Sequence, residues 1–358
     1  MSTYLHSFPA VRGIQSGRPC YIAMCPMRVV PTLFKFDEEE VPPELRAQRT
    51  LNLNRVPEIA SYLLDNPQDY TLSCVTASIN SKVSFAPSED IGLGANIGTL
   101  TVPMDAQIII NDGQHRRKAI EAAIKENPEL GHDSIPVMFF IDEGLARAQQ
   151  MFADLNKHAV RPSDSLSTLY DLRDQISELG RHVQKNVHVF SRTTEMEKSS
   201  ISNRSLKLFT LSAIKNATKA LLKKSGKDTI SKGDKDLAVK FWNDVAANMP
   251  DWQKVLSREI APSGLRESFV HAHGVTLQAI GIVGSELLLL PERSWKAKLK
   301  KLKSIDWSRI NPAWEGRAMN NGRISKATYN VARTAIYIKK ELNMPLRDED
   351  KQIEQEFT

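Results

Sequence analysis

The clearest chemistry in this sequence is expected of residues 112–116, which read Asp-Gly-Gln-His-Arg. The β-branched run at 108–110 predicts a short buried strand, and the Asp-Gly pair after it favours a tight turn. Beyond the turn, four apolar residues recur at helical spacing: Ala119, Ile120, Ala123 and Ile124. The pattern therefore predicts a strand, a turn and a helix whose first turn carries Gln, His and Arg.

A helix that begins after Gly113 offers an anion site. The first N–H groups of a helix have no partner within it, and the helix dipole is positive at that end. Gly113, Gln114, His115 and Arg116 would then hold a phosphate or a carboxylate. Asp112 is the only acid that we connect with catalysis. Its carboxylate could coordinate a metal, accept a hydrogen bond from a ribose hydroxyl, or cap the helix. The alternative is a plain turn, in which Asp112 is only a cap and Arg116 is solvated.

This segment resembles the signature of the DGQHR-domain family, which includes the DndB regulators of DNA phosphorothioation (sulfur modification) systems. The likeness extends to residues 48–55 and 150–158, and the order of the three blocks matches. The family is similar in turn to ParB and sulfiredoxin, in which an equivalent turn binds nucleotide phosphates. Sulfiredoxins carry a catalytic Cys just before the His-Arg pair. Gln114 stands there in this sequence, which excludes reduction of a sulfinic acid.

The resemblance implies further contacts with a nucleotide. It places the segment that precedes the helix beginning near Pro57 against the nucleotide pocket, so Arg49 and Arg55 are candidates for a second anion contact. Asn156 and Lys157 would touch base, ribose or phosphate. The implied ligand is ATP or CTP with Mg²⁺. A solvated basic loop is the alternative for the two arginines, and a helix C-cap is the alternative for Asn156.

Composition bounds the rest. A chain of 358 residues with 41% hydrophobic and 25% charged residues predicts a soluble globular protein of two domains. The net charge of +6 and the pI near 9.1 permit a nucleic-acid partner without requiring one. The three cysteines have no zinc-like spacing, and we see neither a secretory signal nor a membrane span, so we expect a cytoplasmic protein.

Residues 1–160 alternate strand and helix patterns, which predicts an α+β domain of the ParB/sulfiredoxin type with a small mixed sheet. Strands are expected at 20–24, 29–34, 72–83, 108–110 and 135–141. Helices are expected from Pro57, from the 112–116 turn, and over 143–155. The Pro-, Ser- and Gly-rich stretch 84–98 is expected to be a flexible loop.

Residues 161–358 predict a mainly α-helical domain. Helices are expected over 163–180, 205–224, 236–247, 275–290 and 326–342, with an extended piece at 187–190 and a frayed acidic tail. His271 and His273 are two residues apart without an obvious third ligand, so a structural role is favoured over a metal site, and no metal site is assigned.

Two basic segments of this half are candidates for contact with the DNA backbone. The first is a helix face with Lys215, Lys219, Lys223 and Lys224. The second is the run at 295–303, with Lys298 and Lys300. Arg204 ends a polar segment, 199–204, that precedes a helix and would suit base readout. The alternative is that these lysines are solvated faces with no partner.

Two functions remain open. The resemblance implies a transcriptional repressor that binds double-stranded promoter DNA of its own phosphorothioation operon, gated by a nucleotide at the 112–116 turn. The alternative is a ParB-like NTP-binding enzyme, an ATPase or a CTPase, acting in DNA modification or restriction. A nuclease is the weaker third interpretation, because no convincing metal cluster is visible. A homodimer is the general expectation for a DNA repressor.

Overall fold

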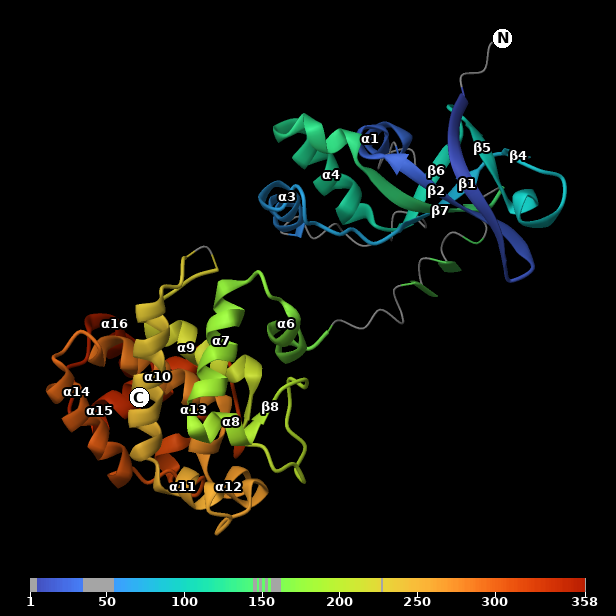
Figure 1. The fold of residues 1–358 in the computed structure, drawn as a ribbon. Helices are drawn as coiled ribbons and strands as arrows, with labels where there is room; N and C mark the ends of the chain where they lie inside the picture. Colours follow the sequence, from blue (N-terminus) through green and yellow to red (C-terminus); the bar gives the residue numbers. More distant parts are fainter. Residues whose placement is uncertain are drawn as a thin grey trace. The chain divides into compact units, whose positions relative to one another are not determined.

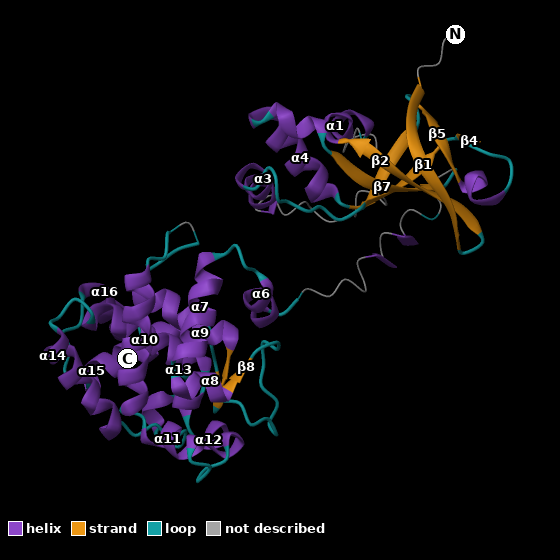
Figure 2. Ribbon diagram, viewed as in Figure 1, coloured by secondary structure: helices purple, strands orange, loops and turns teal. Residues whose placement is uncertain are grey.

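The computed structural model describes residues 5–34, 55–143, 147, 150, 151, 154, 155, 162–226 and 228–357. The chain divides into two compact units, Met1–Val160 and Arg161–Thr358. The first contains a mixed sheet with helices, and the second is almost entirely helical (Figures 1 and 2). The predicted α+β fold class is confirmed.

The first unit is built on a seven-stranded sheet with the order β4-β5-β1-β2-β7-β3-β6. β3 and β7 run parallel, and the other neighbouring strands run antiparallel. The strands are β1 (Leu5–Gln15), β2 (Arg18–Pro26), β3 (Val75–Asn80), β4 (Ser84–Pro87), β5 (Ile97–Pro103), β6 (Gln107–Asp112) and β7 (Ser134–Ile141). The sheet is larger than the small one predicted.

Three helices lie beside one another at the sheet in Figure 1: α1 (Val30–Leu33), α3 (Arg55–Asp65) and α4 (Gln114–Glu126). Their apolar faces complete the core of this unit, where Leu63 of α3 and Ile120 of α4 join Phe139 of β7. Short 3₁₀ turns connect the elements: η1 (Met27–Val29), η2 (Gly92–Asn96) and η3 (Pro128–His132).

Two sequence predictions for this unit are wrong. The strand expected over 29–34 is replaced by helix α1, in whose first turn Pro31 lies, where its missing N–H costs nothing. The stretch 84–98 contains β4, η2 and the start of β5, so its turn residues punctuate ordered elements. The helix expected over 143–155 falls largely outside the described residues.

The helical unit contains α6 (Asp164–Tyr170), α7 (Gln175–Asn186), α8 (His188–Thr193), α9 (Leu211–Leu222), α10 (Lys232–Ala247), α11 (Pro250–Leu256), α12 (Pro262–Ser268), α13 (Gly274–Leu287), α14 (Glu292–Leu299), α15 (Thr328–Glu341) and α16 (Asp348–Gln355). Its short elements are β8 (Thr194–Glu195), β9 (Phe209–Thr210), β10 (Met319–Asn320), β11 (Arg323–Ile324), η4 (Val270–Ala272), η5 (Lys300–Ser304) and η6 (Pro312–Trp314). The extended piece predicted at 187–190 is wrong, since this stretch enters α8. The helix predicted over 163–180 is two helices, separated by a turn in which Asp174 caps α7.

The core of this unit is organised around α13, which is apolar on nearly every side and is therefore a fully buried helix. It packs closely against α9: a Cβ added at Gly281 would lie 2.2 Å from the carbonyl oxygen of Ala217. Gly284 similarly faces Phe241 and Leu221. Glycine is therefore required where the two backbones meet.

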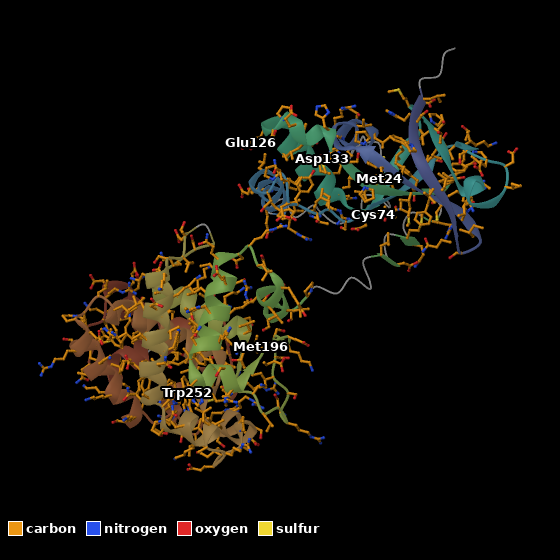
Figure 3. The ribbon with its side chains drawn as sticks, viewed as in Figure 1. Met24, Cys74, Glu126, Asp133, Met196 and Trp252 are labelled. Carbon is orange, nitrogen blue, oxygen red and sulfur yellow. The ribbon has the colours of Figure 1, made fainter. Side chains whose placement is uncertain are left out.

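Aromatic rings fill the space beneath these helices. Trp252, labelled in Figure 3, contacts Phe209 edge-on and stacks on His271. His271 is 1% exposed and also stacks on Trp307. Burial lowers the pKa of His271, although Asp251 beside it acts in the opposite direction. This histidine is thus a neutral part of the core.

The C-terminal tail ends in helix α16, held by buried ion pairs, so the prediction of a frayed tail is wrong. Lys339 of α15 is 0% exposed, and its ammonium lies 2.6 Å from Asp350 and 2.7 Å from Glu286. Arg317 lies 2.6 Å from Glu354. A buried lysine requires such partners, and the pair with Asp350 therefore holds α16 against α15.

Gly281→Ala is expected to destabilise the helical unit by about 1–3 kcal/mol, because the added methyl group overlaps Ala217 and must push α9 away. The five tryptophans all lie in this unit, so guanidinium unfolding followed by tryptophan fluorescence reports on it alone. Gly264→Ala in α12 is the matched control, since its Cβ would meet nothing within 4 Å. Equal stability of the two variants would contradict the close approach.

Candidate functional site

The turn between β6 and α4 has the predicted strand–turn–helix form. β6 ends at Asp112, and α4 begins at Gln114. Gly113 between them has φ = +109°, in a region that residues with a side chain rarely adopt. A Cβ there would also lie 3.0 Å from Cγ2 of Val75 and 3.1 Å from Nη2 of Arg116. Both constraints require glycine.

The backbone of this turn suits an anion. Gly113 is the N-cap of α4 and has no side chain with which to bond the first N–H groups of the helix. The first backbone bond of this helix runs from the N–H of Arg117 to the carbonyl of Gly113, over 2.9 Å. The N–H groups of residues 114–116 therefore precede the helical ladder and face the turn. This is the geometry with which helices bind phosphate.

Arg116 lies across the turn and is not a solvated side chain. Its Nη2 lies 2.7 Å from Oδ2 of Asp112 and donates to the carbonyl of Cys74 over 3.0 Å. The side chain of Arg116 is 19% exposed, and that of Asp112 is 49% exposed. The pair leaves the carboxylate accessible while it holds the guanidinium in place. A phosphate bound here would share or displace the contact with Asp112.

Neighbouring bonds hold the turn from both sides. Asn111 donates to the hydroxyl of Ser78 over 2.8 Å in the interior of the sheet. Arg117 donates to the carbonyl of Pro31 over 2.9 Å and pairs with Glu121 at 3.1 Å, which ties α4 to α1. The turn is therefore rigidly positioned between the sheet and the helices.

Cys74 is a neighbour of this site that the sequence did not single out. It lies directly before β3 (Figure 3), and its carbonyl receives the bond from Arg116. Burial raises the pKa of its thiol, the backbone bond from Met138 and the charge of Arg116 lower it, and Asp112 raises it. Burial similarly raises the pKa of Cys25 to about 12, with Cys74 adding to the shift. Both thiols are therefore protonated at neutral pH, which does not favour nucleophilic chemistry.

The other predicted nucleotide contacts are only partly described. Arg55 is the first residue of α3, the helix that lies beside α4 (Figure 1). Arg49, Asn156 and Lys157 lie outside the described residues. The nucleotide roles of all four remain predictions.

Several predicted DNA-binding residues line one groove of the helical unit. Lys219, Lys223 and Lys224 at the end of α9 line a groove of about 650 Å³ together with Arg347. Lys224 also lies 3.2 Å from Asp234. Arg347 is 50% exposed and pairs with Glu286 at 2.9 Å. Sequence analysis missed Arg347, because it belongs to a different segment.

The remaining basic residues have varied positions. Lys298 donates to the carbonyl of Asn343 over 2.7 Å, which places the end of α14 beside the turn that precedes Arg347. Lys300 is exposed at the start of η5, and Arg204 is exposed in the loop before β9. The stem of Lys215 packs at Gly180 of α7.

Clusters of potential metal ligands and membrane-spanning helices are both absent from the described part of the chain. Within these ranges, no three or more His, Cys, Asp or Glu side chains are grouped so that they could hold a metal ion. Over the same residues, none of the helices combines the length and the apolar character that crossing a bilayer requires. The histidines of the predicted pair have separate contacts: Nε2 of His271 lies 3.4 Å from Oδ2 of Asp251, and Nε2 of His273 donates to the carbonyl of Arg266.

Comparison with known protein families gives a match that covers nearly the whole chain. The model of the DndB family, described as DNA-sulfur modification-associated, matches residues 8–345. The chain therefore belongs to this family. No curated protein and no solved structure matches the chain.

Gly113→Ala is expected to loosen the turn by about 1–3 kcal/mol, because a Cβ at this positive φ is strained and contacts Val75 and Arg116. Amide hydrogen exchange should become faster in β6 and α4 while α13 keeps its protection. Gly17→Ala is the control, since it has a positive φ but no atom within 4 Å of its Cβ. If α4 exchanged no faster in Gly113→Ala than in the control, the proposed constraint on the turn would be wrong.

Proposed function

From the membership of the chain in the DndB family, we propose that it is a DNA-binding transcriptional repressor of a phosphorothioation operon, gated by a nucleotide at the DGQHR turn. The observation that carries the DNA-binding part is the groove at the end of α9. There Lys219, Lys223 and Arg347 come from segments more than a hundred residues apart and line one surface. Convergent cations along a groove are what a phosphate backbone requires.

One contact of Lys298 brings the second basic segment to the turn that precedes Arg347. Because Lys298 binds the carbonyl of Asn343, α14 meets the chain four residues before Arg347. Lys300 follows in the exposed start of η5. Exposed lysines therefore stand both at the end of α9 and at the start of η5, which supports contact with several phosphates of a DNA duplex. A homodimer on a symmetric operator, in the cytoplasm, completes this proposal.

The gating part rests on the DGQHR turn. The uncapped start of α4, the guanidinium of Arg116 and the accessible carboxylate of Asp112 support binding of ATP or CTP with Mg²⁺. Gln114 and His115 stand in the first turn of α4 and would contact the phosphates. The alternative function, an ATPase or CTPase, requires that Asp112 orient water or Mg²⁺ rather than only position Arg116.

Charge reversal of the groove should weaken operator binding. Lys219→Glu with Lys223→Glu is expected to reduce affinity for a promoter fragment at least tenfold. The slope of log K against log salt should fall by about 2, because each of the two lysines neutralises about one phosphate in the wild type. The control is Lys82→Glu with Lys185→Glu, two exposed lysines elsewhere whose reversal changes the net charge equally. Fluorescence anisotropy over a salt series measures both quantities. Equal slopes in the two double variants would place the DNA contacts elsewhere.

Nucleotide binding should depend on Arg116. Calorimetry with ATP and with CTP, each with Mg²⁺, is expected to show binding by the wild type and its loss at the turn in Arg116→Ala. Lys125→Ala removes the same charge from the other end of α4, where the side chain is 75% exposed, and should leave binding intact. Normal binding by Arg116→Ala would show that this turn is not the nucleotide site.

Asp112→Asn separates the gated repressor from the enzyme. If Asp112 only positions Arg116, the amide frees the guanidinium, and phosphate binding should persist or tighten with little dependence on Mg²⁺. If Asp112 holds Mg²⁺ or orients water, hydrolysis should be lost while ATP or CTP still binds. The measurement is the release of inorganic phosphate beside the calorimetric titration.

A further inference from the structure

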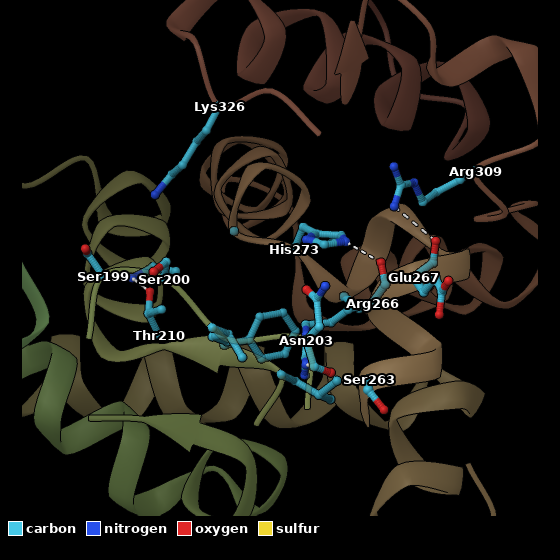
Figure 4. Close-up of a pocket in the computed structure, with 16 residues that line it drawn as sticks. Ser199, Ser200, Asn203, Thr210, Ser263, Arg266, Glu267, His273, Arg309 and Lys326 are labelled. Carbon is cyan, nitrogen blue, oxygen red and sulfur yellow. Dashed lines mark hydrogen bonds between the residues drawn. The ribbon is translucent and has the colours of Figure 1, made fainter. Parts of the chain in front are cut away.

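The helical unit contains a second cavity that none of the functions above uses. It has a volume of about 450 Å³ and lies between the loop before β9, the end of α12, the start of α13 and the segment that leads into α15 (Figure 4). A cavity of this size accommodates a small organic ligand. Its lining is polar and basic, which limits the class of that ligand.

Three cationic side chains line the cavity: Arg266, Arg309 and Lys326. Arg266 is 8% exposed and donates to the carbonyls of Ser202, Asn203, Ser205 and Lys207. Arg309 donates to the carbonyls of Glu267 and Gly322 over 3.0 and 2.8 Å. Carbonyl groups orient both guanidinium groups without neutralising their charge.

Glu267 is the one acidic residue among those that line the cavity. It lies on the Arg309 side in Figure 4, across the cavity from Lys326. Asp164 acts on Lys326 only through its charge: desolvation lowers the pKa of the lysine, and Asp164 raises it. The charges along the cavity wall therefore leave an excess of positive charge.

The position of Lys326 adds to this excess. Its Nζ lies 3.6 Å from the point where a Cβ of Gly274 would stand, at the first residue of α13. The start of a helix carries a partial positive charge, so an ammonium group beside it is repelled. An anion between the two would be attracted by both. A negatively charged ligand would therefore stabilise this arrangement.

The remaining polar groups suit an oxygen-rich molecule. Ser199, Ser200, Thr210 and Ser263 bring hydroxyl groups to the cavity, and Asn203 brings an amide. Burial lowers the pKa of His273 to about 4, so its imidazole is neutral at pH 7 and donates from Nε2 to the carbonyl of Arg266 over 2.7 Å. The formal positive charges of the cavity wall are therefore those of the lysine and the two arginines.

We propose that this cavity binds the phosphate group of a small phosphorylated molecule of the size of a nucleotide, held by Lys326, Arg309 and the start of α13. The hydroxyl groups of the loop before β9 contact the rest of the ligand. This site is separate from the DGQHR turn and lies within the unit that carries the basic groove. A ligand bound in the cavity would therefore contact the same unit that we propose binds DNA.

The test is calorimetry on the full chain with two probes, inorganic phosphate and AMP, without Mg²⁺. The wild type is expected to bind AMP, and to bind inorganic phosphate more weakly. Lys326→Gln should weaken both at least tenfold, because it removes a positive charge that holds the phosphate. The variant should still fold, because this side chain forms no hydrogen bond or ion pair on which the described fold depends. Adding Arg309→Gln should abolish binding, with thermal unfolding confirming that the variant is folded. Arg293→Gln with Lys303→Gln is the control, two exposed residues of the same unit with the same change in charge.

Arg116→Ala separates this site from the DGQHR turn. The proposal requires that Arg116→Ala still bind AMP and that Lys326→Gln lose it. Loss in Arg116→Ala with normal binding by Lys326→Gln would overturn it, as would absence of binding by the wild type. Loss of promoter binding in Lys326→Gln, with no binding of AMP or phosphate by the wild type, would also overturn it and assign the cavity to a phosphate of the DNA backbone.

Discussion

The left-handed backbone of Gly113 is the constraint on which the candidate nucleotide site depends. With φ at +109°, the chain leaves β6 and enters α4 within one residue, and the absence of a Cβ leaves room for Arg116 beside Val75. Arg116 can then reach both Asp112 and the carbonyl of Cys74. Without that backbone conformation, the start of α4 and the guanidinium would not face the same space. The backbone conformation of Gly113 is therefore a precondition for the chemical groups of the turn to act together.

Local signals predicted this turn well, because strand, breaker and helix are each encoded within about six residues. The long buried helix α13 was also visible as an apolar run, and the α+β class followed from alternating patterns. Two of the errors arose where contacts between distant parts of the chain decide the structure. The residues of the acidic tail by themselves predict a frayed end. In the structure Asp350 pairs with Lys339 and Glu354 pairs with Arg317, two residues from other parts of the chain. Residues 187–190 have β-branched character, yet residues 188–190 are helical and the ring of Phe190 packs against Trp242 in the core.

The candidate binding residues show the same division. Lysine spacing along α9 identified one basic face, but Arg347 joins it only through folding, and Lys298 bonds the turn after α15. No sequence pattern predicts the cavity lined by Ser199, Asn203 and Arg266, because these residues come together only once β9, α12 and α13 have packed. Neighbouring charges in a sequence can be read directly. Charges that meet across a fold, and the carbonyls that orient them, cannot.

The two candidate anion sites differ in what a ligand must do to enter. At the DGQHR turn, Arg116 already has a carboxylate partner at 2.7 Å, so a phosphate must displace or share Asp112, and a divalent cation between the two anions would offset their repulsion. In the cavity of the helical unit, Lys326 and Arg309 have no carboxylate to release within the described residues, and carbonyl groups fix the arginine in advance. Binding there requires no exchange of partners and no metal. From this difference we expect ligand binding to depend on Mg²⁺ at the DGQHR turn and to be independent of Mg²⁺ in the cavity.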